Sequence, residues 1–207
     1  QPIVGCSVPI AATARTFRLE MGNEGPGLTP LYEALSIDLT GCCVILDAQR
    51  VHGAVWGEIL ATAAHNCGAS GVLICGSVRD KAQVIQIGIP LYAMHEIVVG
   101  PAGRAHVQEV GGPITMGASI SGTISDPVSD TIVNNGDLIV CDESGCVAIP
   151  PAISNQILDA ARTLLFSSGI DSISISRISK QAELGVGTIY FYYKNKDITY
   201  LNICHIR

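Results

Sequence analysis

The pattern of apolar and polar positions divides the chain into two regions. Up to about residue 150, short β-branched apolar runs recur, each of strand length and bounded by Gly, Asp or Pro. These runs are residues 42–46, 71–75, 89–93, 138–141 and 146–149. An Ala-rich helix is expected over 57–67, closed by Gly68, and a strand, helix and strand in this order predict a parallel pair with a crossover connection. The Gly-, Ser-, Thr- and Ile-rich stretch 100–137 predicts strands and turns, so the fold class of this region is α/β.

The second region has the spacing of amphipathic helices. Apolar residues fall on one helical face from Ile153 to Phe166, and Gly169 ends this helix. Ser174 is a natural N-cap for a second helix, and a break at 184–185 leads to a short helix over 186–193. This order predicts a small all-α helix-turn-helix unit. We therefore expect two domains, 1–152 and 153–207.

Composition and charge exclude several classes of protein. Hydrophobic residues make up 48% of the 207 residues and charged residues 14%, which excludes disorder over most of the chain. The net charge of -6 argues against a general binder of nucleic acids or membranes, but the segment after Ala152 carries 6 basic and 4 acidic residues. No apolar run reaches the length of a membrane helix and no signal peptide is evident, so we expect a cytoplasmic protein with no membrane partner. The eight cysteines form no C-x-x-C pair and are interpreted as mostly buried thiols.

The most specific local pattern joins the start of the first predicted helix to the end of the next strand. Gly57 and Glu58 open the helix, and Arg79 and Asp80 follow after a spacer of 20 residues between Glu58 and Arg79. In a parallel arrangement both pairs can meet at the mouth of the sheet. There a helix N-terminus and an arginine can hold a carboxylate, while two acidic side chains offer oxygen ligands to a divalent cation. The alternative is that Glu58 only compensates the helix dipole and that Arg79 and Asp80 form a surface ion pair.

The first region resembles the regulator of ribonuclease E activity A (RraA) family, which includes 4-hydroxy-4-methyl-2-oxoglutarate aldolases that also decarboxylate oxaloacetate. The resemblance is carried by the sequences 57–60 (GEIL), 76–80 (GSVRD), 89–93 (IPLYA), 135–137 with Asp142, and 145–150 (GCVAIP). It implies a swivelling β/β/α domain that assembles as trimers or hexamers, with the active site at a subunit interface. It also implies a metal-dependent lyase that cleaves 2-oxo acids to pyruvate.

The same resemblance implies a role for each site residue. Asp80 would bind Mg²⁺ or Mn²⁺, and Glu58 would position metal-bound water that acts in proton transfer. Arg79 would hold the carboxylate of the 2-oxo acid. The backbone around Gly57, with the amides of Ile59 and Leu60, would bind the same carboxylate from the helix end.

The second region resembles the DNA-binding domain of tetracycline-repressor-type (TetR) regulators. The resemblance rests on 187–190 (GTIY), 192–196 (YYKNK) and the apolar positions of the preceding helices. It implies DNA contacts by five residues: Ser174, Thr188, Tyr190, Tyr192 and Lys196. The alternative is that Tyr190 and Tyr193 pack in the core of the helical unit, which we favour for Tyr193.

Three functions remain open on these grounds. The first is the metal-dependent lyase, the second a non-enzymatic regulator of ribonuclease activity, and the third a DNA-binding transcription regulator in which the first domain oligomerises or senses a 2-oxo acid. The five histidines form no ligand set, although His52 lies close to the predicted mouth of the site.

Overall fold

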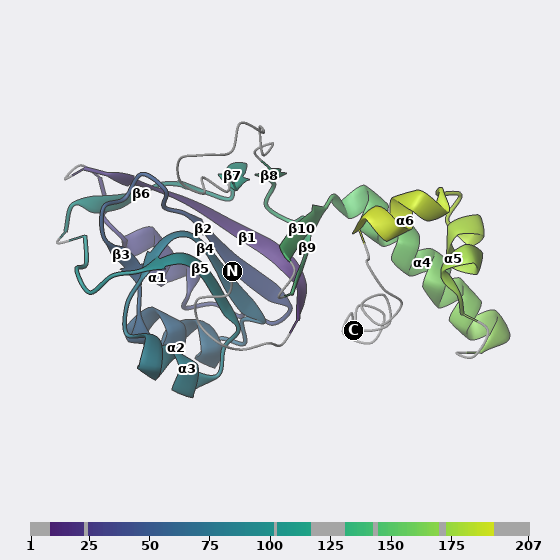
Figure 1. Cartoon of the computed structure of the whole chain (residues 1–207), viewed down its shortest axis with the longest axis horizontal. Helices are drawn as coiled ribbons and strands as arrows, with labels where there is room; N and C mark the ends of the chain where they lie inside the picture. Colours follow the sequence, from purple (N-terminus) through teal and green to yellow (C-terminus); the bar gives the residue numbers. More distant parts are fainter. Residues whose placement is uncertain are drawn as a thin grey trace.

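In the computed structural model the chain forms an α/β unit followed by a helical unit (Figure 1). The structure describes residues 9–22, 25–101, 103–116, 131–142, 145–169 and 173–192. The predicted mixed α/β region and the predicted small helical unit are both confirmed.

The α/β unit is built on one eight-stranded sheet. Its strands are β1 (Ile10–Met21), β2 (Cys42–Asp47), β3 (Ala54–Trp56), β4 (Gly71–Val78), β5 (Leu91–Glu96), β6 (Ala105–Val110), β9 (Leu138–Asp142) and β10 (Gly145–Ile149). Six strands follow the order β10-β9-β1-β2-β4-β3. In addition, β5 pairs with β4 and β6 pairs with β1. Strands β2, β3 and β5 all run parallel to β4, so their carboxyl ends lie at one edge of the sheet.

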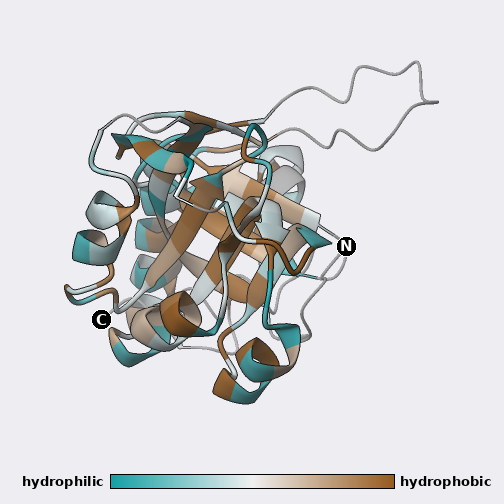
Figure 2. Ribbon diagram, turned by 90° about the vertical axis from the view of Figure 1, so that its left-hand side faces the viewer, coloured by the Kyte–Doolittle hydropathy of each residue, from teal (hydrophilic) through white to brown (hydrophobic). Residues whose placement is uncertain are grey.

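The two faces of the sheet carry separate apolar cores. Helices α1 (Thr29–Ala34), α2 (Glu58–Asn66) and α3 (Lys81–Ile87) each bury side chains in the larger cluster, with Leu31, Leu60 and Val84 among them. The opposite face carries a second cluster, which is covered by the antiparallel pair of β7 (Ile114–Met116) and β8 (Thr131–Val133). Figure 2 shows the hydrophobic colour concentrated in the central strands. This double burial explains why all eight residues of β4 are buried.

The helical unit follows the sheet without a spacer. Helix α4 (Pro151–Ser168) starts two residues after β10 and ends at Gly169, and α5 (Ile175–Gln181) and α6 (Val186–Tyr192) follow. The predicted domain boundary at 152/153 thus falls in the first turn of α4. Ile189 of α6 and Ile178 of α5 lie in one apolar cluster with Ile149 of β10, so the core of the helical unit continues into the sheet.

Several local expectations need correction. The strand expected over 89–93 is displaced to Leu91–Glu96, because Pro90 cannot donate a ladder hydrogen bond and only its carbonyl pairs, with the Val72 amide. Among the described cysteines Cys43, Cys75 and Cys141 are buried, but Cys146 is exposed. None of the helices in the described part of the chain combines the length and apolar character needed to span a bilayer.

Candidate functional site

The predicted site residues meet at the carboxyl edge of the parallel strands. Strand β3 ends at Trp56, and Gly57 is the N-cap of α2. Strand β4 ends at Val78, and Asp80 is the N-cap of α3. Register brings the two ends together, because Trp56 pairs with Val78 and the Arg79 amide donates to the Trp56 carbonyl at 2.9 Å.

Asp80 adopts a backbone conformation that is uncommon for its residue type. Its φ of 58° and ψ of 37° are left-handed, a region that costs a non-glycine residue roughly 1–2 kcal/mol, somewhat less for Asp. The turn sends the carboxylate back towards α2, where Oδ2 accepts a hydrogen bond from the Glu58 amide at 3.2 Å. Strain of this kind is concentrated at functional sites in proteins.

Position 57 requires glycine because the Asp80 and Arg79 side chains approach its Cα closely, and not because its backbone needs the freedom of glycine. Its φ of -164° is extended and open to any residue, but a Cβ there would lie 2.5 Å from Asp80 Oδ2 and 3.0 Å from Arg79 Cγ. The Arg79 Nε atom lies 3.4 Å from Asp80 Oδ2, which completes a compact group of backbone amide, guanidinium and carboxylate.

The amides of Ile59 and Leu60 lie in the first turn of α2. The first helical hydrogen bond of α2 runs from the Ala61 amide to the Gly57 carbonyl at 3.0 Å, so the two preceding amides are not used inside the helix. Leu60 is buried, whereas the Ile59 side chain is 75% exposed.

A cavity of about 440 Å³ adjoins this group. Its walls include Gly57, Ile59, Leu60, Arg79 and Asp80 from the predicted set, so that five of the six predicted residues surround one space. Glu58 contributes through its backbone amide, and its side chain is exposed.

The cavity also has walls that the sequence did not indicate. Tyr32 of α1 and the loop from Val99 to Pro101 contribute to it, and the Arg79 Nη1 atom lies 3.4 Å from a Cβ built on Gly100. Trp56 lines it as well, and its buried indole N–H has no hydrogen-bond partner in the described structure. An adjacent Trp-Gly pair at a strand end is the one signal that could have indicated this wall.

The residues present fit a cation that keeps most of its own water. Oδ1 of Asp80 accepts no hydrogen bond from any described residue, and the Asp80 side chain is 37% exposed. Among the described residues, no three His, Cys, Asp or Glu side chains gather into a group that could enclose a metal ion. A site with one or two carboxylates, completed by water and substrate, is the arrangement typical of Mg²⁺.

The predicted DNA-contacting residues are only partly placed. The Ser174 hydroxyl caps α5 by accepting from the Arg177 amide at 3.3 Å. On α6, Thr188 is half-buried and Tyr190 is 52% exposed, so Tyr190 is a surface residue rather than part of the helical core. Tyr192 ends α6 but its side chain is outside the description, as are Tyr193 and Lys196 altogether.

Comparison with known protein families shows to which family the first region belongs. The sequence model of the family described as Aldolase/RraA matches residues 1–148. The chain belongs to this family. Residues 157–197 match the family described as bacterial regulatory proteins of the tetR type, so the RraA-like region is followed by a TetR-type segment.

Solved structures agree with this assignment at the level of the fold. The RNA-processing inhibitor RraA of Thermus thermophilis has a TM-score of 0.55 and 22% identity, over 72% of this chain and 80% of that one. RraAS2 of Streptomyces coelicolor, described as an unusual member of the RNase ES inhibitor RraA protein family, has a TM-score of 0.59 and 17% identity, over 82% and 79%.

Two curated relatives match the TetR-type segment. An uncharacterized HTH-type transcriptional regulator of Haemophilus influenzae is 38% identical over 45 residues, or 22% of this chain and 24% of the regulator. The fatty acid metabolism regulator protein of Bacillus subtilis is 45% identical over 42 residues, or 20% and 22%. The chain therefore spans less than a quarter of the length of these relatives.

Proposed function

We propose that the RraA-like unit is a divalent-metal-dependent lyase that cleaves 2-oxo acids to pyruvate, of the 4-hydroxy-4-methyl-2-oxoglutarate aldolase and oxaloacetate decarboxylase type. The observation that carries the proposal is the convergence of the α2 N-terminus, Arg79 and Asp80 on one cavity. The alternative of a simple surface ion pair does not explain why Gly57 leaves room for the Asp80 carboxylate.

Different groups of this chain bind the substrate, hold the cation and assist proton transfer. The Arg79 guanidinium and the free amides of Ile59 and Leu60 hold the substrate carboxylate, because all of them are donors directed at one end of the cavity. Asp80, with Glu58 through water, would hold Mg²⁺ or Mn²⁺, which acts as a Lewis acid towards the 2-oxo group. The Glu58 side chain, exposed at the rim, orders the water that supplies the proton taken up by the pyruvyl carbon after carbon-carbon cleavage.

The test is pyruvate release from oxaloacetate with Mg²⁺ or Mn²⁺, repeated with a chelator. Arg79→Ala and Asp80→Ala are expected to lose the metal-dependent release down to the rate of free metal. Matched controls exist in the helical unit, where Arg162 and Asp159 form an exposed ion pair of 3.4 Å, and Arg162→Ala and Asp159→Ala should keep full activity. Normal turnover by the Asp80 variant, or release that survives chelation, would refute the proposal.

Self-association as a trimer or hexamer forms part of the proposal. Apolar side chains are exposed around the cavity, with Ile59 at 75%, Val98 at 89% and Val99 at 68%. Such a patch beside a site is typical of a surface covered by a partner. Size-exclusion chromatography with light scattering should show a trimer or hexamer that Val98→Asp dissociates. A monomeric wild type would contradict the proposed self-association.

A second function, DNA binding through the helical unit, is favoured by the exposure of Tyr190 on α6. Helix α6 follows α5 after a short turn, as a recognition helix does. We expect a mobility shift on the DNA upstream of its own gene that weakens as salt rises. Tyr190→Ala should reduce it and Phe166→Ala, an exposed aromatic on α4, should not; no shift at low salt would contradict DNA binding.

A further inference from the structure

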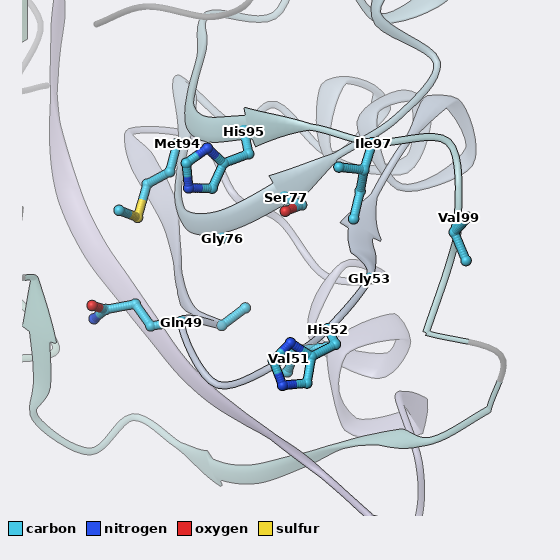
Figure 3. Close-up of a pocket in the computed structure, with 11 residues that line it drawn as sticks. Gln49, Val51, His52, Gly53, Gly76, Ser77, Met94, His95, Ile97 and Val99 are labelled. Atoms are coloured by element: carbon cyan, nitrogen blue, oxygen red, sulfur yellow. The ribbon is translucent and has the colours of Figure 1, made fainter. Parts of the chain in front are cut away.

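A second cavity, of about 550 Å³, lies at the same edge of the sheet as the candidate lyase site. Ser77 near the end of β4 and His95 of β5 are paired in the sheet, and the segment 48–53 that follows β2 forms the facing wall. Figure 3 shows the Ser77 hydroxyl and the rings of His52 and His95 around this space. Val99 is the one residue that lines both cavities.

The two cavities lie towards opposite faces of the sheet. Ile74 and Val78 of β4 pack in the core under α2 and α3, whereas Leu73 packs in the core on the other face. Ser77, adjacent to Val78 in the same strand, points away from the helices by strand alternation. A molecule in the second cavity would therefore contact none of the Gly57, Arg79 and Asp80 group.

The polar groups around the second cavity have unused hydrogen-bonding capacity. Ser77 is only 9% exposed, yet its hydroxyl bonds to no described residue, and neither do the rings of His52 and His95. Gln49 differs, because its Nε2 donates to the Thr115 carbonyl at 2.8 Å and to Asp47 at 3.3 Å. The amide N–H groups of Gln49 are thus already engaged, although Gln49 lines the cavity, and the Ser77 hydroxyl and the two imidazoles are the side-chain donors left without a partner.

The chemistry of the walls selects the ligand. No acidic residue lines the cavity, although the chain as a whole carries a net charge of -6. Two imidazoles without a third His, Cys, Asp or Glu in the described structure are too few to enclose a metal ion. The remaining walls include Val51, Met94 and Ile97, which suit a short hydrocarbon chain.

The walls are also built on fixed backbone. A Cβ on Gly76 would lie 2.9 Å from the Ala48 Cβ and 3.1 Å from its carbonyl oxygen, so β4 and the 48–53 segment are in direct contact. A Cβ on Gly53 would lie 2.7 Å from the Pro101 nitrogen. These contacts fix the backbone that carries Ser77 and His52, whereas the exposed side chains of His52 and His95 would be ordered by the ligand.

We propose that this cavity binds a small aliphatic carboxylate, with the carboxylate on Ser77, His52 and His95 and the hydrocarbon chain against Val51, Met94 and Ile97. The site is separate from the proposed lyase site and does not depend on that function. It gives the α/β unit a place to sense a carboxylate that is not its substrate.

The test is a ligand-observed NMR titration with sodium butyrate, and with butyramide as the uncharged analogue. Butyrate should bind saturably and butyramide should not. The double variant His52→Ala/His95→Ala, and separately Ser77→Ala, should weaken butyrate binding by about tenfold or more. His65→Ala, an exposed histidine on α2, is the matched control and should bind as the wild type does.

Arg79→Ala separates this site from the lyase site. If the proposal is right, butyrate still binds to Arg79→Ala with unchanged affinity, whatever the lyase assays show. Three results would overturn it: no saturable binding, equal binding of butyramide, or binding that Arg79→Ala removes and the histidine variants do not. Circular dichroism of each variant verifies that loss of binding is not loss of fold.

Discussion

The α/β unit and the helical unit each contain one non-glycine residue with left-handed backbone among the described residues. In the α/β unit it is Asp80, at φ 58°, and in the helical unit it is Glu183, at φ 53°, in the turn between α5 and α6. Asp80 uses the conformation to direct a carboxylate at the Glu58 amide. Glu183 is exposed and only reverses the chain. The same local strain therefore directs a carboxylate at a helix N-terminus in one unit and reverses the chain in the other.

The two units also differ in the number of apolar clusters that form their cores and in whether a cluster is shared. The α/β unit has an apolar cluster on each face of its sheet. The helical unit has one cluster, which Leu138, Val140 and Ile149 of β9 and β10 help to complete. A TetR-type segment is thus held against the sheet by side chains and not by a flexible linker. We expect disturbance of this shared core to affect the helical unit more than the candidate site around Asp80.

The largest effect is expected from Ile189→Ala on α6. Ile189 is 0% exposed in the shared cluster, and removing such a side chain costs about 2–5 kcal/mol. Urea unfolding should show this loss, while metal-dependent pyruvate release stays unchanged. Phe166→Ala, at a residue 88% exposed, should change stability by less than about 0.5 kcal/mol. Similar stabilities for the two variants would contradict the shared core.

Asp80→Gly is expected to separate the cost of the left-handed backbone at residue 80 from the proposed role of its carboxylate. Glycine adopts the left-handed conformation without steric cost, so the fold should be as stable as the wild type or more so. Metal-dependent pyruvate release should nevertheless fall by about 100-fold or more, because the carboxylate is gone. Steady-state kinetics and thermal unfolding measure the two effects, and retained turnover would show that Asp80 has only a backbone role.

Ser174→Ala tests the cap of α5. The Ser174 hydroxyl accepts from the Arg177 amide, and loss of such a cap costs about 1 kcal/mol. The loss should appear in chemical unfolding of the chain. Ser176→Ala, one position inside the same helix and exposed, is the control and should be neutral or slightly stabilising. If both variants behave alike, the cap does not contribute.

The smallest effect is expected from Glu183→Gly. Relief of the left-handed strain outweighs the added backbone entropy of glycine, so stability should rise by about 0.5 kcal/mol. Glu183→Ala, which keeps the strain, should show no gain. Thermal unfolding compares the two variants, and a loss of stability in Glu183→Gly would indicate that the Glu183 side chain contributes something the contacts do not show.

Local signals in the sequence predicted the helical unit well. Ser174 as N-cap and Gly169 as the end of the first helix are both confirmed, because capping depends on nearest neighbours. The site pairs were also predicted to meet, and they do, since parallel pairing aligns the ends of β3 and β4.

Features that depend on tertiary contacts were not predicted. The 12-residue strand β1 mixes buried positions with partly and fully exposed ones and has no continuous apolar run, and it is fixed by pairing with β2, β6 and β9. Helix α3 is only seven residues long and begins at the strained Asp80. The cavity of His52 and His95 joins segments more than 40 residues apart, which no local pattern could connect.

The proposed lyase requires Asp80 to hold a divalent cation beside Arg79. The most direct measurement is Mn²⁺ binding by water-proton relaxation, comparing the wild type with Asp80→Asn, and with Asp159→Asn as a control for an exposed carboxylate. We expect saturable binding by the wild type and the control, and its loss in Asp80→Asn. Equal Mn²⁺ binding by all three proteins would contradict it.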